Sequence, residues 1–147
     1  FYVFVNDKNV QDMLNEAIKV GFKLHNILIW KKNNCTPNRW YMKNCEFILF
    51  FHKGKSFPIN NKESSQFLNY KNTNGKDKLH PTQKPVELIK ELILNSSQDG
   101  DLILDPFMGS GTTAIACINT NRNYIGFELD EKYYKIAVDR INNIKTQ

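Results

Sequence analysis

Apolar residues follow two different spacings along the first part of the chain, and each spacing predicts a different element. Residues 10–18 place apolar side chains at helical spacing, which predicts a helix that Gly21 ends at its C′ position. Residues 22–30 and 45–51 are short runs rich in β-branched and aromatic residues and bounded by turn residues, which predicts two strands. Residues 1–5 predict a further strand.

The second part of the chain alternates strands and helices more regularly. It predicts strands at residues 102–105 and 124–128, and helices that follow Thr82, Gly111 and Asp130. We expect Thr82 and Asp130 to cap the first and last of these helices through their side chains. Four residues are expected to form the buried stripe of the last helix: Tyr134, Ala137, Val138 and Ile141. Strands that alternate with helices are typical of an α/β fold on a mostly parallel sheet.

Length and composition place this sequence among globular proteins of one domain. The chain has 147 residues, 41% of them hydrophobic and 24% charged, which is enough for a single core, so residues 1–147 are expected to form one domain. It lacks an apolar run long enough to span a bilayer and a signal-peptide pattern at its start, so no membrane partner is predicted. Three cysteines without a C-x-x-C pair indicate neither a disulfide framework nor a metal site, and they favour a cytoplasmic location.

The net charge of +5 and the pI of about 9.1 favour a polyanionic partner, although a merely basic surface explains them equally well.

Residues 102–113 carry the most informative chemistry, because an apolar strand there runs directly into a glycine turn that opens a helix. Gly109 and Gly111 have no Cβ, so the backbone can adopt positive φ and approach a ligand closely. The N–H groups at the start of the helix attract electron-rich atoms. Glu128 ends the next predicted strand, where its carboxylate can accept hydrogen bonds from both hydroxyls of a ribose.

The glycine spacing alone leaves the ligand open. Gly109, Gly111 and Ala114 fit the G-x-G-x-x-A pattern of a dinucleotide site, so an NAD-dependent oxidoreductase is one interpretation. Asp105 and Pro106 argue against it, because a carboxylate and a missing N–H donor disfavour a pyrophosphate. A ligand with cationic groups, such as S-adenosylmethionine, fits better. A phosphate-binding P-loop is disfavoured because no lysine follows the last glycine.

Three sequence blocks stand out by their order and spacing: H-P-T-Q-K-P at 80–85, D-P-F-M-G-S-G-T-T at 105–113 and G-F-E-L-D at 126–130. Together they resemble the DNA amino-methyltransferases, which use S-adenosylmethionine to methylate adenine N6 or cytosine N4. Two upstream segments, N-I-L-I-W-K-K-N-N and N-C-E-F-I-L-F-F-H-K-G, resemble the strands that follow the catalytic motif in this family. The cofactor blocks come after these strands, which is the motif order called the β group.

The resemblance implies a Rossmann-like methyltransferase sheet, with a cofactor-binding region at residues 80–130. It places the ribose of S-adenosylmethionine at Glu128, its carboxylate end at 82–84 and its methionine part at the glycine turn. The implied cofactor-binding residues are Thr82, Gln83, Lys84, Asp105, Pro106, Phe107, Gly109, Ser110, Gly111, Thr112, Thr113 and Glu128. No catalytic role is assigned to His80.

The resemblance also implies double-stranded DNA as a partner, with residues 55–79 as the candidate target-recognition loop. This segment is rich in Asn, Ser and Lys with isolated aromatics, which predicts a surface loop. Its lysines are suited to phosphates and its aromatic rings to stacking on a base, although an ordinary solvated loop has the same composition. The residues concerned are Lys55, Lys62, Lys71, Lys76, Lys78, Phe67 and Tyr70.

One expected motif is missing from the sequence. Family members carry a D-P-P-Y, N-P-P-Y or S-P-P-Y loop that holds the extruded base, whereas the prolines here are never adjacent. In the β-group order this loop would precede Phe1, together with two strands, one of them between the strands at 102–105 and 1–5. We therefore expect an N-terminally truncated, inactive and poorly stable chain, or one that a second chain completes. A catalytically dead remnant that still binds the cofactor is the alternative.

Overall fold

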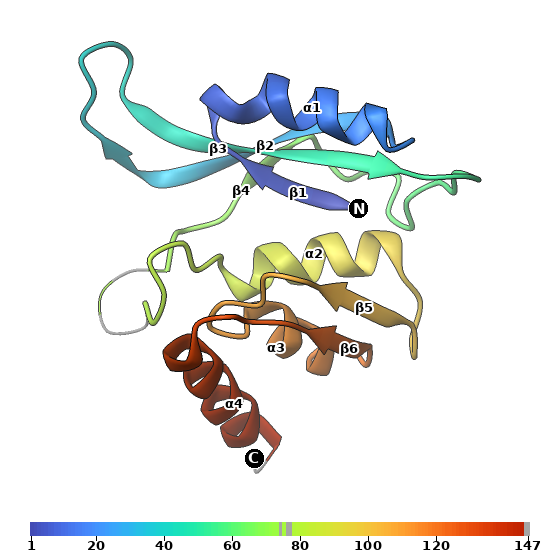
Figure 1. The fold of residues 1–147 in the computed structure, drawn as a ribbon, viewed down its shortest axis with the longest axis vertical. Helices are drawn as coiled ribbons and strands as arrows, with labels where there is room; N and C mark the ends of the chain where they lie inside the picture. The colour runs from blue at the N-terminus through green and yellow to red at the C-terminus, as the bar shows by residue number, and fades with distance from the viewer. Residues whose placement is uncertain (74, 76–77, 146–147) are drawn as a thin grey trace. The chain divides into compact units, whose positions relative to one another are not determined.

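The computed structural model describes residues 1–73, 75 and 78–145, which belong to two compact units, Phe1–Lys71 and Asn72–Gln147 (Figure 1). The first unit contains β1 (Tyr2–Val5), the short 3-10 helix η1 (Asp7–Asn9), α1 (Val10–Lys19), β2 (Lys23–Thr36), β3 (Lys43–His52) and β4 (Phe67–Asn69). The second contains α2 (Val86–Ser96), β5 (Leu102–Asp105), α3 (Thr112–Ile118), β6 (Asn123–Gly126) and α4 (Glu131–Lys145). In the described part of the chain, no helix is both long and apolar enough to cross a membrane.

α1 ends where the sequence predicts. Gly21 has φ +89°, and its N–H donates to the carbonyl of Ile18 at 2.9 Å. The N–H of Phe22 donates to the carbonyl of Ala17 at 3.0 Å. These two bonds are the Schellman arrangement, in which a left-handed residue satisfies the last carbonyls of a helix. The prediction that Gly21 terminates this helix is confirmed.

The sheet of the first unit is mixed, so the expectation of a mostly parallel sheet is wrong. Its strand order is β1-β3-β2-β4, with β3 antiparallel to both β1 and β2 and with β4 parallel to β2. β2 and β3 follow each other through a short connection, which permits a hairpin, whereas parallel neighbours require a long crossover. That requirement is met in the second unit, where α3 connects the parallel pair β5 and β6.

One apolar cluster holds α1 against the sheet of the first unit. Val5, Leu49 and Phe51 are buried at its centre, at 6%, 0% and 2% exposure. Side chains from α1, from neighbouring strands and from the turn between α1 and β2 pack around them: Val3, Val10, Leu14, Ala17, Phe22, Ile27 and Phe47. Of the apolar residues predicted for the helix, Val10, Leu14 and Ala17 therefore face the sheet, whereas Met13 and Ile18 are 37% and 59% exposed.

A strand forms inside the predicted loop at residues 55–79, which is a correction to the sequence interpretation. β4 lies beside β2, where the N–H of Ile29 donates to the carbonyl of Gln66 at 2.8 Å. Trp30 is 2% exposed, and its indole Nε1 donates to the carbonyl of Tyr70 at 2.8 Å. Three residues are too few for a recognisable alternation, so the pairing comes from β2 as a template. Lys76 lies outside the described residues.

In the second unit α3 packs against α2, α4 and β6, as an apolar helix next to a sheet should. The prediction that Asp130 caps the last helix is confirmed, since its Oδ1 accepts from the N–H groups of Lys132 and Tyr133 at 2.9 and 3.2 Å. The prediction that Thr82 caps α2 is wrong. α2 begins at Val86 with Pro85 in the N-cap position, and no side chain caps it by a hydrogen bond.

Candidate functional site

The turn from β5 into α3 is held by the carboxylate of Asp105. One oxygen, Oδ1, accepts from the N–H of Phe107 at 2.9 Å. The other, Oδ2, accepts from the hydroxyl of Thr113 at 2.5 Å. Asp105 therefore joins the end of β5 to the first turn of α3. Although its N–H is held in this way, Phe107 is 85% exposed.

Both glycines of the turn have the positive φ that the sequence predicts: +55° at Gly109 and +83° at Gly111. At Gly111 a Cβ would also lie 3.1 Å from the Cβ and 3.2 Å from the Cα of Ala137 on α4. A side chain at this position is thus disfavoured by backbone strain and by lack of space. At Gly109 the nearest atoms to such a Cβ belong to the ring of His80, at 3.8 Å.

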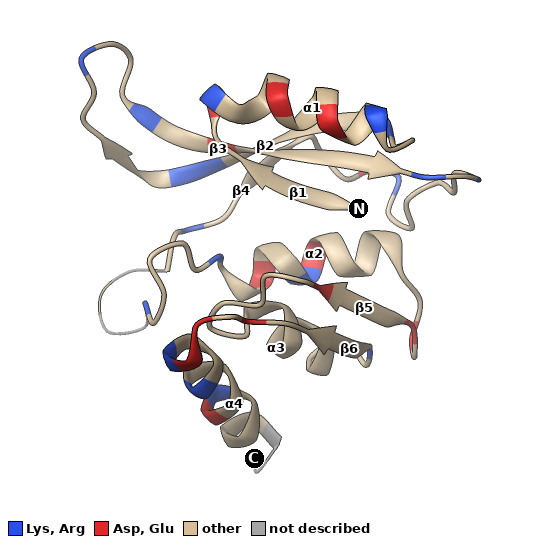
Figure 2. Ribbon diagram, viewed as in Figure 1, with Lys and Arg blue, Asp and Glu red and all other residues tan. Residues whose placement is uncertain are grey.

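The segment after β6 brings Glu128 to the glycine turn. Its Oε2 accepts from the N–H of Gly109 at 2.7 Å, and its Oε1 accepts from the N–H of Asp130 at 3.0 Å. β6 ends at Gly126 rather than at Glu128, so this carboxylate lies beyond the strand instead of within it. Because β5 and β6 are parallel neighbours, their carboxyl ends share one edge, which is the edge where α/β folds bind ligands. Figure 2 shows acidic residues on the segment between β6 and α4.

Backbone hydrogen bonds continue this pairing past the strand end. The N–H of Phe127 donates to the carbonyl of Asp105 at 3.0 Å, and the N–H of Met108 donates to the carbonyl of Phe127 at 2.8 Å. Met108 packs tightly against Gly126, where a Cβ would lie 1.9 Å from its Cε. The segment that carries Glu128 is therefore tied to the turn by main chain as well as by side chain.

Residues 80–85 lie against the same turn, as the order of the sequence blocks predicts. Gln83 accepts through Oε1 from the N–H of Leu79 at 2.8 Å and from the hydroxyl of Ser110 at 3.3 Å. Thr82 is exposed and pairs through its hydroxyl with Nδ1 of His80 at 3.0 Å. Lys84 is half-buried. The side chain of Gln83 thus joins this segment to the glycine turn.

α4 supplies contacts to the site that the sequence did not reveal. Arg140 donates to the carbonyl of Ser110 at 2.5 Å and to its hydroxyl at 3.1 Å. Burial lowers the pKa of Arg140. The ring of Tyr133 packs edge-on against His80 with 4.1 Å between centroids. The predicted stripe is wrong at one position, since Tyr134 is 55% exposed and Tyr133 faces the site. A helical pattern does not fix which of two adjacent aromatics turns inward.

The geometry brings together every predicted site block in the second unit. Ser110 and Thr112 are buried at 3% and 7% exposure, and the latter begins α3. Pro106, which has no N–H, follows the end of β5. The result is one edge that combines an exposed aromatic ring, a left-handed glycine turn, an oriented carboxylate and a lysine. Such a set suits a ligand with an apolar part, hydroxyls and both signs of charge.

Comparison with known proteins agrees with the resemblance found in the sequence. Residues 1–139 match the family N6_N4_Mtase, described as DNA methylase. The chain is 36% identical over 144 residues to the Type II methyltransferase M2.MboI of Moraxella bovis, a match that covers 84% of this chain and 52% of that protein. The chain thus spans about half the length of the curated relatives it matches.

Two solved structures are also similar. The crystal structure of the M1.HpyAVI complex with SAM has a TM-score of 0.81 and 31% identity, and the match covers 95% of this chain and 72% of that one. The PvuII DNA methyltransferase, described as cytosine-N4-specific, has a TM-score of 0.77 and 19% identity, covering 96% of this chain and 62% of that one. At that identity the second likeness shows the fold alone.

Proposed function

This chain belongs to the N6/N4 DNA methylase family, and from that premise we propose that it is the cofactor-binding part of a methyltransferase that acts on adenine N6 in duplex DNA. One observation carries the proposal. The glycine turn, residues 80–85 and Glu128 converge at the carboxyl ends of β5 and β6. The family is dependent on S-adenosylmethionine, which supplies an electrophilic methyl group on a sulfonium.

The residues at this edge fit that cofactor. Two backbone N–H groups hold the oxygens of Glu128, and each oxygen keeps a lone pair for a ribose hydroxyl. Phe107 exposes its ring to an apolar or cationic group, and Lys84 offers a charge to a carboxylate. Gly109 and Gly111 leave the backbone of the turn without a side chain at two positions, so a ligand can approach it closely there. In this proposal the chain binds and orients the cofactor and excludes water from the reacting atoms.

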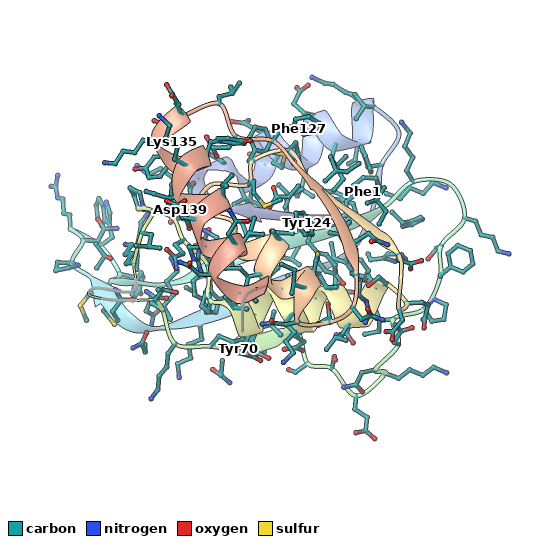
Figure 3. The ribbon with its side chains drawn as sticks, turned by 90° about the horizontal axis from the view of Figure 1, so that it is seen from below. Phe1, Tyr70, Tyr124, Phe127, Lys135 and Asp139 are labelled. Atoms are coloured by element: carbon teal, nitrogen blue, oxygen red, sulfur yellow. The ribbon has the colours of Figure 1, made fainter. Side chains whose placement is uncertain are left out.

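Glu128 provides the sharpest test of this assignment. Glu128→Ala removes a charge-assisted contact worth about 1.5–3 kcal/mol, so affinity for S-adenosylhomocysteine should fall by roughly 10- to 150-fold in isothermal titration. Glu131→Ala is the matched control. Its carboxylate pairs only with Lys135, at 2.6 Å, among the interactions described for it, and Figure 3 shows Lys135 on α4. Equal affinities of Glu128→Ala and wild type would contradict the ribose assignment.

A thermal-shift comparison separates this function from its rivals. A ligand at 100 times its Kd stabilises a fold by about 2.7 kcal/mol, so S-adenosylhomocysteine should raise the Tm whereas NADH should not. Stabilisation by NADH alone would support the oxidoreductase interpretation instead. No stabilisation by either ligand would contradict the cofactor site altogether.

The proposal also requires a catalytic loop from outside these residues. The sequence contains no D-P-P-Y type motif, so we expect no methyl transfer from radiolabelled S-adenosylmethionine to duplex DNA by the 147 residues alone. Leu102 and Leu104 of β5 are 59% and 62% exposed, and in the described residues β5 pairs only with β6. An exposed apolar strand with an open edge supports the expectation of low stability and of a second segment or chain that completes the sheet.

Adding a polypeptide that carries the missing motif should restore transfer. Analysis of the methylated nucleosides then distinguishes N6-methyladenine from N4-methylcytosine, the alternative product within this family. Robust transfer by the isolated chain would contradict the requirement for the loop. Cofactor binding with no transfer under any complementation would indicate a catalytically dead remnant.

A further inference from the structure

The connection between β2 and β3 forms an arm that the proposed cofactor site does not use. Thr36 pairs with Lys43, and residues 37–42 reverse the chain between them. In Figure 1 this connection projects past the N-terminal end of α1. We call residues 36–43 the hairpin tip. Every residue of the hairpin tip is exposed.

The hairpin tip presents large apolar side chains to solvent. Trp40, Tyr41 and Met42 are 77%, 94% and 62% exposed. By contrast, Trp30 at the base of the same hairpin is 2% exposed. Turns normally carry small or polar residues such as Gly, Asn and Asp, and three consecutive large apolar residues add nothing to a core from this position. Their placement therefore indicates a partner.

The charged residues of the hairpin tip and of the adjoining part of β2 are all basic, although two of them pair with acidic residues from elsewhere in the first unit. Residues 31–43 contain four basic residues and no acidic one, and Figure 2 shows blue at the tip and on both strands that lead to it. Lys32 pairs with Glu46 at 2.8 Å, and Lys43 pairs with Asp7 at 2.9 Å. Lys31 is exposed.

Arg39 is the fourth of these basic residues. It is exposed and lies over the ring of Trp40, 5.4 Å from the centroid. A guanidinium on an aromatic face remains able to bind phosphate at its edge. The hairpin tip thus combines a cation for phosphate with rings for stacking.

We propose that the hairpin tip is a DNA-contacting element, in which Trp40 and Tyr41 stack on nucleobases while Arg39, together with Lys31 on β2, binds the flanking phosphates. This rests on the proposed function, and it goes beyond residues 55–79 as the DNA contact. Basic grooves with stacking aromatics are the usual means of holding unstacked bases. Chemistry on a base requires that base to leave the duplex, which uncovers base faces for such rings.

The test measures binding of the 147-residue chain to a fluorescein-labelled DNA duplex with a single-stranded gap, by fluorescence anisotropy. Base stacking makes a large contribution per ring, so Trp40→Ala/Tyr41→Ala should weaken binding by about fivefold or more. Trp40→Phe/Tyr41→Phe keeps both ring faces and should bind within about twofold of wild type. Tyr134→Ala removes an exposed aromatic from α4 and should leave binding unchanged. Circular dichroism verifies that each variant is folded.

Tryptophan fluorescence gives a second readout that a purely electrostatic contact would not change. Trp30 is buried and Trp40 is exposed, so stacking on DNA should quench the emission of the latter. Titration with the same DNA should quench wild type and leave Trp40→Phe nearly unquenched. Quenching of equal size in both proteins would overturn the assignment of stacking to the hairpin tip.

The outcomes separate this proposal from the one on which it rests. Unchanged DNA affinity in Trp40→Ala/Tyr41→Ala overturns the DNA role of the hairpin tip, even when S-adenosylhomocysteine still binds. A wild-type chain that binds the cofactor product but no DNA overturns it as well. So does self-association that these substitutions abolish while DNA affinity stays unchanged, because the tip would then contact a second copy. DNA binding through the tip without any cofactor binding supports this proposal and contradicts the cofactor assignment.

Discussion

Gly111 is subject to two separate constraints, one from its own backbone and one from a neighbouring helix. Its φ of +83° lies in the left-handed region, and Ala137 on α4 occupies the space where a Cβ would lie. Gly100 has nearly the same φ, +81°, but nothing lies within 4 Å of the corresponding position. The pair therefore distinguishes backbone strain from steric contact.

We predict that Gly111→Ala lowers the free energy of unfolding by about 1–3 kcal/mol, and by more than Gly100→Ala does. Urea denaturation followed by circular dichroism measures both variants. The excess in Gly111→Ala reports the contact with Ala137, because the strain from φ is common to the two. Equal losses of unfolding free energy in the two variants would contradict a destabilising contact between the new Cβ and Ala137.

Residue-scale expectations succeeded where the requirement is local. The left-handed turn at Gly109 and Gly111 and the cap by Asp130 follow from properties of single residues. Thr82 failed as a cap because α2 begins only at Val86, so the N-cap position is Pro85, three residues after Thr82. Arg140 went unnoticed because its partner Ser110 is 30 positions away in the sequence.

Arg122 joins several elements of the second unit, a role that no pattern in the sequence indicates. Its side chain is 6% exposed, and it donates to the carbonyl of Thr120 and to the hydroxyl and carbonyl of Ser97, which follows α2. It also pairs with Asp99 at 2.7 Å. Arg122 immediately precedes β6, and its guanidinium thus satisfies one carbonyl that follows α2 and one that follows α3.

We predict that Arg122→Met lowers the free energy of unfolding by about 1–3 kcal/mol, because buried carbonyls lose their donors. Asp99→Asn is the control. The side chain of Asp99 is 73% exposed, and an ion pair with such an exposed carboxylate contributes little to the stability of the fold. Chemical denaturation compares the two variants. A larger loss in Asp99→Asn than in Arg122→Met would show that the ion pair, rather than the carbonyl contacts, stabilises this junction.

At the scale of elements, the sequence predicted whether a segment is a helix or a strand more reliably than it predicted how the strands pair. The helix over residues 10–18 and the strand before the glycine turn are present close to their expected bounds. The mixed sheet was missed because an apolar run looks the same in parallel and antiparallel neighbours. β4 was missed because it is short and depends on the edge of β2 for its hydrogen bonds.

The whole chain carries a net charge of +5, which adds a long-range term to any contact with DNA. Each phosphate neutralised on a duplex contributes about −0.9 to the slope of log K against log salt. The charge of the chain therefore predicts that DNA affinity falls as salt rises, whatever the bound sequence.

We predict that Lys31→Ala makes this slope shallower by about 0.9, because one phosphate contact is lost. Lys135→Ala removes the same charge from α4, where the lysine pairs with Glu131, and should leave the slope unchanged. Anisotropy titrations at several salt concentrations measure both. An unchanged slope in Lys31→Ala would exclude that lysine from the DNA contact.

The sequence by itself determined the features that depend on local chemistry: a strand that enters a glycine turn, the helix that follows, and the block order typical of N6/N4 DNA methylases. Only the tertiary structure decided which distant groups meet. It placed Glu128 on the N–H of Gly109, Ala137 against Gly111 and the aromatic hairpin tip in solvent. The reason is physical, since local propensity acts over a few bonds whereas strand pairing and packing depend on residues far apart in the chain.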